Sequence, residues 1–263
     1  MVTVAVAIAG SEATGGAGAQ TDLKTFHKLG TFGAVALTCI VSFDPKDNWN
    51  HLFVPVDPGV IRQQIDAITA VHEPDTVKLG MLGTVATIDA VAEKLGEREW
   101  KNVVVDPVLI CKGQQPGAAL DTDNALKEKI LPYATVVTPN VFEATQLSGI
   151  EVVDLDSLKE AAKLIHEKLG VPYVVAKGGA VLPGGDAVDV LYDGENFTEY
   201  REPKIGERYI SGAGCTLAAA ITAELAKGAD IHGAVQVAKD TVTEAIRNRV
   251  TDLPTPFDEV YQG

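Results

Sequence analysis

The sequence has few cysteines, few basic residues and no long hydrophobic run. Its three cysteines, Cys39, Cys111 and Cys215, are scattered over 263 residues without CxxC spacing, so neither a disulfide framework nor a cysteine-based metal site is expected. Lysine and arginine number 22 against 36 acidic residues, and the net charge of −14 disfavours binding to nucleic acid or anionic lipid. No apolar run reaches the ~18 residues that span a bilayer. We therefore expect free thiols and neither a nucleic-acid nor a membrane partner.

Histidine clusters, nucleophile–base triads and linkers are missing as well. None of the five histidines has the spacing of a metal-binding pair, which disfavours a metal hydrolase. No repeat, low-complexity segment or Pro/Ser-rich stretch divides residues 1–263, so we predict a single domain. The first residues form an apolar run that leads directly into glycines, without a basic lead. We expect a first strand there instead of a signal peptide, and a cytoplasmic protein.

The residues that are present predict an α/β fold. The chain is 46% hydrophobic and 22% charged, a composition typical of a packed globular core. Short β-branched runs alternate with segments of helical period, which indicates parallel βαβ units. Asp193-Gly194, flanked by two β-type segments, predicts a hairpin. Strands are expected at 4–9, 34–41, 76–79, 103–105, 135–137 and 173–176, helices at 60–71, 87–95, 155–169 and 218–226, and a surface tail or edge at 251–263.

A glycine-rich loop follows the first expected strand, from Gly10 to Gly18, and a helix is expected to begin near Gln20. In open α/β sheets ligands bind beyond the carboxyl ends of the strands, and glycines let the backbone approach a ligand closely. The loop matches neither GxGxxG nor a P-loop, which disfavours a dinucleotide-dependent oxidoreductase. A purely structural turn is the alternative.

Oxygen ligands follow two other expected strands. Asp106 ends the run Val-Val-Val-Asp-Pro-Val, and Asn140 and Glu143 lie three residues apart at a helix start. Two carboxylates and an amide at one sheet edge suit Mg²⁺ that bridges phosphates. A helix cap would explain the same residues.

The last two patterns favour phosphoryl transfer. Lys177 leaves an apolar strand directly before two glycines, and Gly212, Ala213 and Gly214 lead into an alanine-rich helix. Their N–H groups can converge on an anion, and the helix dipole together with the metal on neighbouring phosphates is expected to lower the pKa of the Cys215 thiol. A solvated lysine and a buried inert cysteine are the alternatives. Together the cation site, the lysine and the anion nest are the parts that phosphoryl transfer needs.

In this order, the segments Ala-Gly-Ser-x-x-x-Gly-Gly-Ala-Gly, Val-Asp-Pro-Val, Thr-Pro-Asn-x-x-Glu-Ala, Lys-Gly-Gly and Gly-Ala-Gly-Cys-Thr resemble the vitamin kinases of the ribokinase-like superfamily. The similarity is to the branch of hydroxymethylpyrimidine kinases and bacterial pyridoxal kinases. The resemblance implies a three-layer αβα fold with a mostly parallel central sheet, a small-molecule vitamin substrate and a cytoplasmic homodimer. It also implies ATP and Mg²⁺ as cofactors, with a monovalent cation as a further expectation.

The same resemblance implies a role for each matching residue. Catalysis is expected from Gly212, Ala213 and Gly214 as the anion hole, from Cys215 as the base in place of the usual aspartate, and from Cys111 on a lid. The expected metal ligands are Asp106 and Glu143. ATP is expected to contact Asn140, Glu143, Lys177, Asp189 and Gly214, and the acceptor substrate Ser11, Glu12, Gly18, Phe43, His51 and Met81.

Departures from the pyrimidine kinases favour pyridoxal as the substrate. Phe43 stands where those enzymes have a glutamine that binds the aminopyrimidine edge, and an unmatched buried polar edge costs affinity. The Cys111 thiol could add to the aldehyde of pyridoxal, which the pyrimidine lacks. Ile210-Ser211 replaces the usual Thr-His, which leaves the proton transfer less defined. A hydroxymethylpyrimidine or phosphomethylpyrimidine kinase and a non-catalytic vitamin or nucleotide sensor stay open as alternatives.

Overall fold

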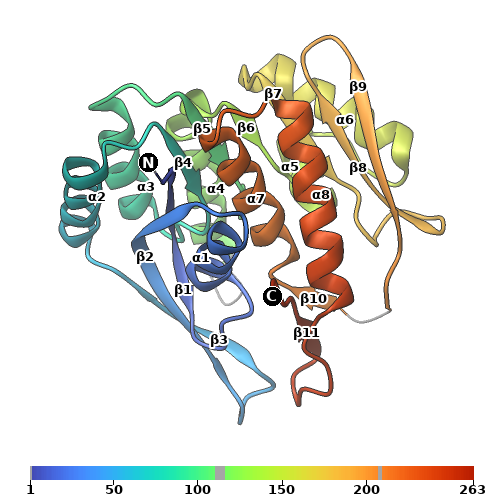
Figure 1. The fold of residues 1–263 in the computed structure, drawn as a ribbon, viewed down its shortest axis with the longest axis horizontal. Coiled ribbons are helices and arrows are strands. Elements are labelled where there is room, and N and C mark those ends of the chain that lie inside the picture. Colours follow the sequence, from blue (N-terminus) through green and yellow to red (C-terminus); the bar gives the residue numbers. More distant parts are fainter. Residues whose placement is uncertain (1, 110–115, 207–208) are drawn as a thin grey trace.

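The computed structural model describes residues 2–109, 116–206 and 209–263. Within these residues nine strands form one sheet in the order β3-β2-β1-β4-β5-β6-β7-β8-β9. The six strands from β2 to β7 in that order run parallel, whereas β3, β8 and β9 are antiparallel to their neighbours. Helices cover both faces (Figure 1). The expected three-layer αβα fold with a mostly parallel sheet is confirmed.

The strands of the large sheet are β1 (Val4–Glu12), β2 (Phe32–Asp44), β3 (Asn50–Pro55), β4 (Thr76–Leu79), β5 (Asn102–Val105), β6 (Val136–Val137), β7 (Tyr173–Lys177), β8 (Asp186–Tyr192) and β9 (Phe197–Pro203). The helices are α1 (Gly18–Lys28), α2 (Pro58–His72), α3 (Val85–Gly96), α4 (Pro116–Lys129), the short 3₁₀ helix η1 (Leu131–Tyr133), α5 (Val141–Ser148), α6 (Leu155–Leu169), α7 (Ala213–Ala226) and α8 (Ile231–Arg247). A separate pair is formed by β10 (Tyr209–Ser211) and β11 (Phe257–Glu259).

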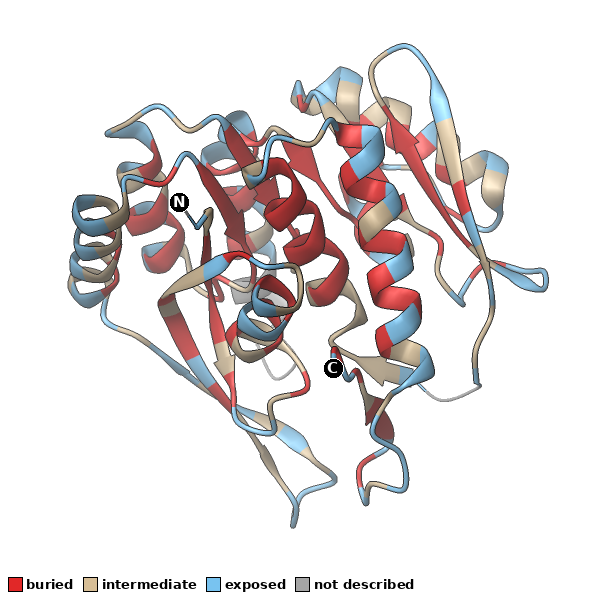
Figure 2. Ribbon diagram, in the orientation of Figure 1, coloured by how far each residue is buried: buried red, intermediate tan, exposed pale blue. Residues whose placement is uncertain are grey.

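Successive side chains of the central strands point to opposite faces of the sheet, which divides the core into two layers. Val77 and Leu79 of β4 pack with Ile61 of α2 and Ile88 of α3, together with other apolar side chains from α4 to α6. On the opposite face the apolar side chains belong to α1, α7 and α8. Figure 2 shows α7 buried along most of its length, between α1 and α8. An alanine-rich sequence lets this helix lie close to the sheet.

Most expected elements are present, with shifted ends. The expected strand at 76–79 and helix at 155–169 match β4 and α6, and the hairpin around Asp193-Gly194 is the β8–β9 turn. Helix α7 begins at Ala213, earlier than expected, because the glycine nest itself is the helix start. The C-terminal segment is more than a surface tail, because Val260 and Gln262 are buried and β11 pairs with β10. None of the helices in the described parts of the chain is long and apolar enough to cross a membrane.

Candidate active site

A cavity of about 620 Å³ lies at the carboxyl ends of the parallel strands, between the glycine-rich loop and the start of α7. The sequence had placed the functional residues after separate strands, and parallel strands bring such positions to one sheet edge. Every predicted site residue that the structure describes lines this cavity: Ser11, Glu12, Gly18, Phe43, His51, Met81, Asp106, Asn140, Glu143, Lys177, Asp189, Gly212, Ala213, Gly214 and Cys215. Cys111 lies outside the described residues.

Asp106 and Lys177 form a largely buried ion pair that lines the cavity. The Lys177 ammonium donates to Oδ1 of Asp106 at 2.7 Å, and the Thr138 hydroxyl donates to the same oxygen at 3.2 Å. Burial alone would raise the pKa of Asp106, but Lys177, Lys78 and these hydrogen bonds reverse the effect and hold it below its usual value. Asp106 is therefore an ionised carboxylate. Its partner Lys177 is the positive charge that an anion entering this site would contact.

Asn140 and Glu143 cap helix α5. The Glu143 N–H donates to Oδ1 of Asn140 at 2.9 Å, and the Asn140 N–H donates to Oε2 of Glu143 at 2.8 Å. The structural alternative is thus present as a complete capping box. Both residues also line the cavity, so the cap orients them toward it. Burial raises the pKa of Glu143 to about 7, opposed by Lys177 and reinforced by Asp106.

The two carboxylates that line the cavity, Asp106 and Glu143, are oxygen ligands of the kind that Mg²⁺ prefers. Mg²⁺ commonly binds one or two protein carboxylates and completes its shell with water and substrate phosphates. No group of three His, Cys, Asp or Glu side chains that could hold a metal occurs in the part of the chain that the structure describes. Among the described residues the protein itself therefore offers at most these two carboxylates to such an ion.

Gly212 and Gly214 build the nest at the start of α7. Gly212 caps the helix with φ of 85°, and a Cβ there would lie 1.8 Å from the Gly16 carbonyl oxygen. Any side chain would therefore push the nest away from the glycine-rich loop. A Cβ at Gly214 would lie 3.2 Å from Nζ of Lys177, so this turn of backbone packs directly on the ammonium.

The Cys215 thiol is harder to ionise in the free protein than expected. Burial raises its pKa to about 11, while the Lys78 charge and the Gly18 N–H oppose that rise. The expected lowering involves the metal on bound phosphates as well as the helix dipole, so it stays a prediction for the loaded site; in the protein without ligands the removal of the sulfur from water dominates. A thiolate at this site depends on nearby positive charge.

Glu12 holds the glycine-rich loop in shape. Its carboxylate accepts hydrogen bonds from the Thr14 and Ala17 N–H groups at 2.7 and 3.1 Å, and Ser11 accepts one from Gln20 at 2.7 Å. Glu12 therefore contributes to the cavity mainly as the anchor of the loop.

Asp189 pairs with a residue that the sequence analysis missed. Lys239 of α8 donates to Oδ2 of Asp189 at 2.8 Å, and both side chains line the cavity almost completely buried. Because Lys239 lies inside an ordinary amphipathic helix, no local pattern marks it.

Lys78 was missed too, although its sequence context contained a signal. It lies in β4 among fully buried neighbours, and its ammonium donates to Oδ1 of Asp22 in α1 at 2.6 Å. Both side chains are 0% exposed. A lysine inside an apolar strand is unusual and marks a buried partner. Lys78 lines the cavity and is the strongest influence lowering the pKa of Cys215.

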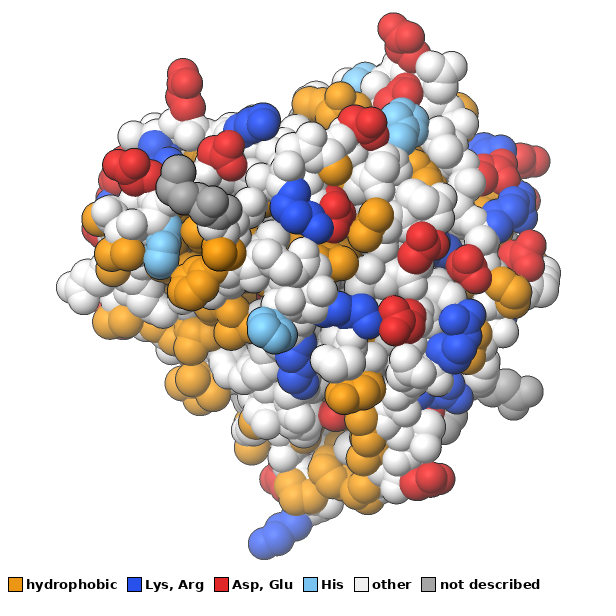
Figure 3. Space-filling model, in the orientation of Figure 1, with side chains coloured by type: hydrophobic (Ala, Val, Ile, Leu, Met, Phe, Trp, Pro, Cys, Tyr) orange, Lys and Arg blue, Asp and Glu red, His pale blue; other side chains and the backbone are white. Residues whose placement is uncertain are grey.

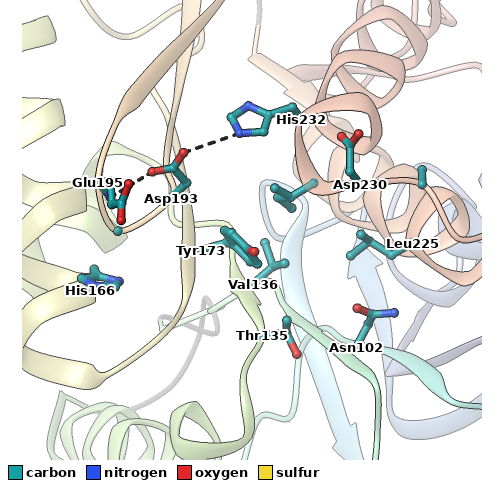
Figure 4. A pocket seen from close by; sticks show the side chains of 13 residues that line it. Asn102, Thr135, Val136, His166, Tyr173, Asp193, Glu195, Leu225, Asp230 and His232 are labelled. Carbon is teal, nitrogen blue, oxygen red and sulfur yellow. Dashed lines mark hydrogen bonds and ion pairs between the residues drawn. The ribbon is translucent and has the colours of Figure 1, made fainter.

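A second cavity, of about 730 Å³, lies at the opposite end of the sheet. Figure 4 shows side chains from the starts of β5 and β7, the β8–β9 turn and the start of α8 around it. Nε2 of His232 and Oδ2 of Asp193 face each other at 3.6 Å. None of the predicted site residues that the structure describes lines this cavity. We assign the chemistry to the cavity at the carboxyl ends because the ion pairs and the anion nest converge there.

Comparison with known proteins agrees with this geometry. A family model described as phosphomethylpyrimidine kinase matches residues 12–253. A pyridoxine kinase of Bacillus subtilis is 48% identical over 244 residues, which cover 92% of this chain and 90% of that protein. A hydroxymethylpyrimidine/phosphomethylpyrimidine kinase of the same organism is 41% identical over 247 residues, which cover 93% of this chain and 89% of that protein. The solved structure of pyridoxal kinase from Staphylococcus aureus with AMP-PCP and pyridoxal matches with a TM-score of 0.90 and 40% identity, covering 99% and 93% of the chains.

Proposed function

Because the chain belongs to the phosphomethylpyrimidine kinase family, we propose that it transfers the γ-phosphoryl group of ATP to the 5′-hydroxymethyl group of pyridoxal. The product is pyridoxal 5′-phosphate, and pyridoxine and pyridoxamine are further acceptors. The observation behind this choice is Phe43, whose ring lines the cavity where a pyrimidine kinase would need an amide. The greater similarity to a pyridoxine kinase than to a pyrimidine kinase supports it.

The phosphates would bind at the centre of the cavity. Lys177 and the N–H groups of Gly212 to Gly214 supply positive charge and donors, with Asn140 and Asp189 on the nucleotide side. Asp106 and Glu143 would hold Mg²⁺, which offsets phosphate charge when bound. A requirement for a monovalent cation is a further expectation, to be tested by comparing turnover in K⁺ and Na⁺ salts.

Cys215 is proposed as the base. Its thiolate would accept the proton of the substrate hydroxymethyl group while that oxygen forms the new bond to phosphorus and ADP leaves. Lys78 lowers the pKa of this thiol, and its charge therefore favours the reactive form. The contribution of Cys111 to aldehyde capture stays a prediction.

A homodimer in the cytoplasm is proposed as the assembly. Ile40, Leu52 and Val54 are exposed by 47%, 52% and 61%, and the β2–β3 register places them on one face of this hairpin. Figure 3 shows hydrophobic side chains on the flank where Figure 1 places these strands. A patch of this kind suits contact with a second copy, and sedimentation analysis of an Ile40→Asp variant tests it.

The substrate assignment is tested by comparing kcat/KM for pyridoxal and hydroxymethylpyrimidine with ATP and Mg²⁺. We expect pyridoxal to be preferred. A preference for the pyrimidine would establish the second candidate, a pyrimidine kinase, which is the activity in the description of the matching family model. Binding of pyridoxal or ATP without any turnover would instead support a sensor.

A further inference from the structure

The C-terminal strand runs alongside the segment that leads into the anion nest. β11 pairs in parallel with β10, with Phe257 opposite Tyr209 and Glu259 opposite Ser211. Because Ser211 directly precedes Gly212, this pairing brings the end of the chain to the cavity. Figure 1 shows β10 and β11 together beneath α8, on the side that faces β3.

Several polar contacts hold this segment in place. The Asp258 carboxylate pairs with Arg249 at 3.0 Å and is 3% exposed. The Val260 N–H donates to the Ser211 carbonyl at 3.1 Å, and the Gln262 amide donates to the Thr216 hydroxyl at 3.0 Å. Thr216 is the neighbour of Cys215, so the segment is joined to the start of α7 as well as to Arg249, just beyond the end of α8.

This arrangement places the Phe257 ring in the wall of the cavity. The ring is 8% exposed, lines the cavity and lies 5.3 Å from the ring of Phe43, tilted by 49°. Phe43 in turn lies 4.7 Å from His51 in an edge-to-face contact. Phe43 and His51 are directly paired across β2 and β3, whereas Phe257 approaches from the opposite end of the chain. The three rings form one aromatic wall, which we call the ring wall.

We propose that Phe257 contacts the heteroaromatic ring of the acceptor substrate and thereby sets its binding affinity. The inference rests on the proposed function, because it concerns the acceptor site of that kinase. A flat heteroaromatic ring gains from offset or edge-to-face contact with aromatic side chains. Phe257 also supports Phe43, the residue on which the preference for pyridine over pyrimidine depends. The C-terminal strand is then a specificity element of the active site.

The proposal is tested with Phe257→Ala and Phe257→Leu, and with Tyr261→Ala as the matched control. Tyr261 is an aromatic residue of the same segment, 52% exposed, and it does not line the cavity. We expect Phe257→Ala to raise the KM for pyridoxal about tenfold, with kcat and the KM for ATP within about twofold of wild type. The KM of Phe257→Leu for pyridoxal should lie between those of wild type and Phe257→Ala, because leucine keeps an apolar side chain of some size. Tyr261→Ala should match wild type.

Thermal unfolding of each variant and calorimetric titration with pyridoxal in the absence of ATP complete the test. If the wild type turns over no acceptor, the proposed function fails, while the titrations still decide on Phe257. If Phe257→Ala binds pyridoxal as tightly as Tyr261→Ala, the proposal is wrong even though the kinase assignment holds. An equal rise in the KM for ATP would also overturn it, since that result indicates loss of structure. If Phe257→Ala does not fold, Phe257→Leu decides by the same comparison.

Discussion

Replacement of Lys78 by methionine is the sharpest test of the buried charges beneath the active site. The side chain is similar in length, so packing is largely kept, but the ammonium that faces Asp22 at 2.6 Å is lost. Oδ2 of Asp22 is buried without a hydrogen-bond partner. Burial already raises the pKa of Asp22 from 3.8 to about 6, although Lys78 opposes that rise. No other side chain among the described residues is hydrogen-bonded to or ion-paired with this carboxylate, so without the lysine its charge would be left uncompensated.

The expected loss is large because one charge of a buried pair is left alone. Removing one partner of such a pair costs ~3 to 5 kcal/mol, which for a protein of this size lowers Tm by on the order of 10 °C. The loss should depend on pH. The folded-state pKa of Asp22, about 6, lies above its unfolded value of 3.8, so the folded protein binds a proton more readily than the unfolded chain. The contribution of this group to stability therefore falls as the pH rises from 3.8 to about 6. In Lys78→Met the pKa of Asp22 should be higher still, so the loss of stability should continue to higher pH.

Thermal unfolding at pH 5 and pH 8 measures both effects. Lys78→Met should lose less stability at pH 5, where Asp22 can be protonated, than at pH 8. Lys78→Met/Asp22→Asn should recover part of the loss, because no charge is left buried. The control is Lys129→Met, which breaks a pair with Asp89 that is about half exposed and is worth less than ~1 kcal/mol. Equal losses for Lys78→Met and Lys129→Met, or a loss independent of pH, would refute this reasoning.

Three further predictions concern the catalytic groups and one helix cap. Cys215→Ala should lower kcat by roughly 10²-fold. Wild-type kcat/KM, which reports the free enzyme, should rise between pH 7 and 9 because burial raises the pKa of this thiol to about 11 in the protein without ligands; near-normal turnover of the variant, or a flat wild-type profile of kcat/KM, would exclude a thiolate base. Glu143→Gln keeps an oxygen for the helix cap but loses its charge, so half-maximal turnover should need more Mg²⁺, and an unchanged Mg²⁺ titration would contradict a role in metal binding. Thr84 caps α3 by accepting from the Thr87 N–H, so Thr84→Ala should cost ~1 kcal/mol in denaturant unfolding, whereas Thr84→Ser should cost little.

Local patterns were sufficient where a residue's neighbours in sequence also decide its environment. Strand β4 and helix α6 follow from hydrophobic period and length. The positions after the strand ends led to Asp106, Asn140 and Lys177, because parallel strands end at a common edge. Boundaries were less accurate at β1, which continues through Gly10 to Glu12 before the glycine-rich loop, and at α7, which begins at Ala213 inside the second glycine-rich segment.

Contacts between distant segments could not be predicted from those patterns. Lys239 lies in an amphipathic helix and Phe257 in a segment with two prolines nearby, and neither position has a distinctive local signature. Their importance depends on which elements pack against them. Lys78 is the intermediate case, since a lysine within a buried strand signals a partner but does not identify Asp22.

The sequence by itself determined the α/β class, the order of the strands along the chain, and the chemical types at their ends. These follow from side-chain periodicity and from backbone preferences of glycine and proline, which act over a few residues. The tertiary structure decided which charges neutralise one another, how strongly burial raises the pKa of Cys215 in the protein without ligands, and that the last strand completes the ring wall. Those outcomes depend on desolvation and on distances between groups far apart in the chain, and only the folded packing sets both.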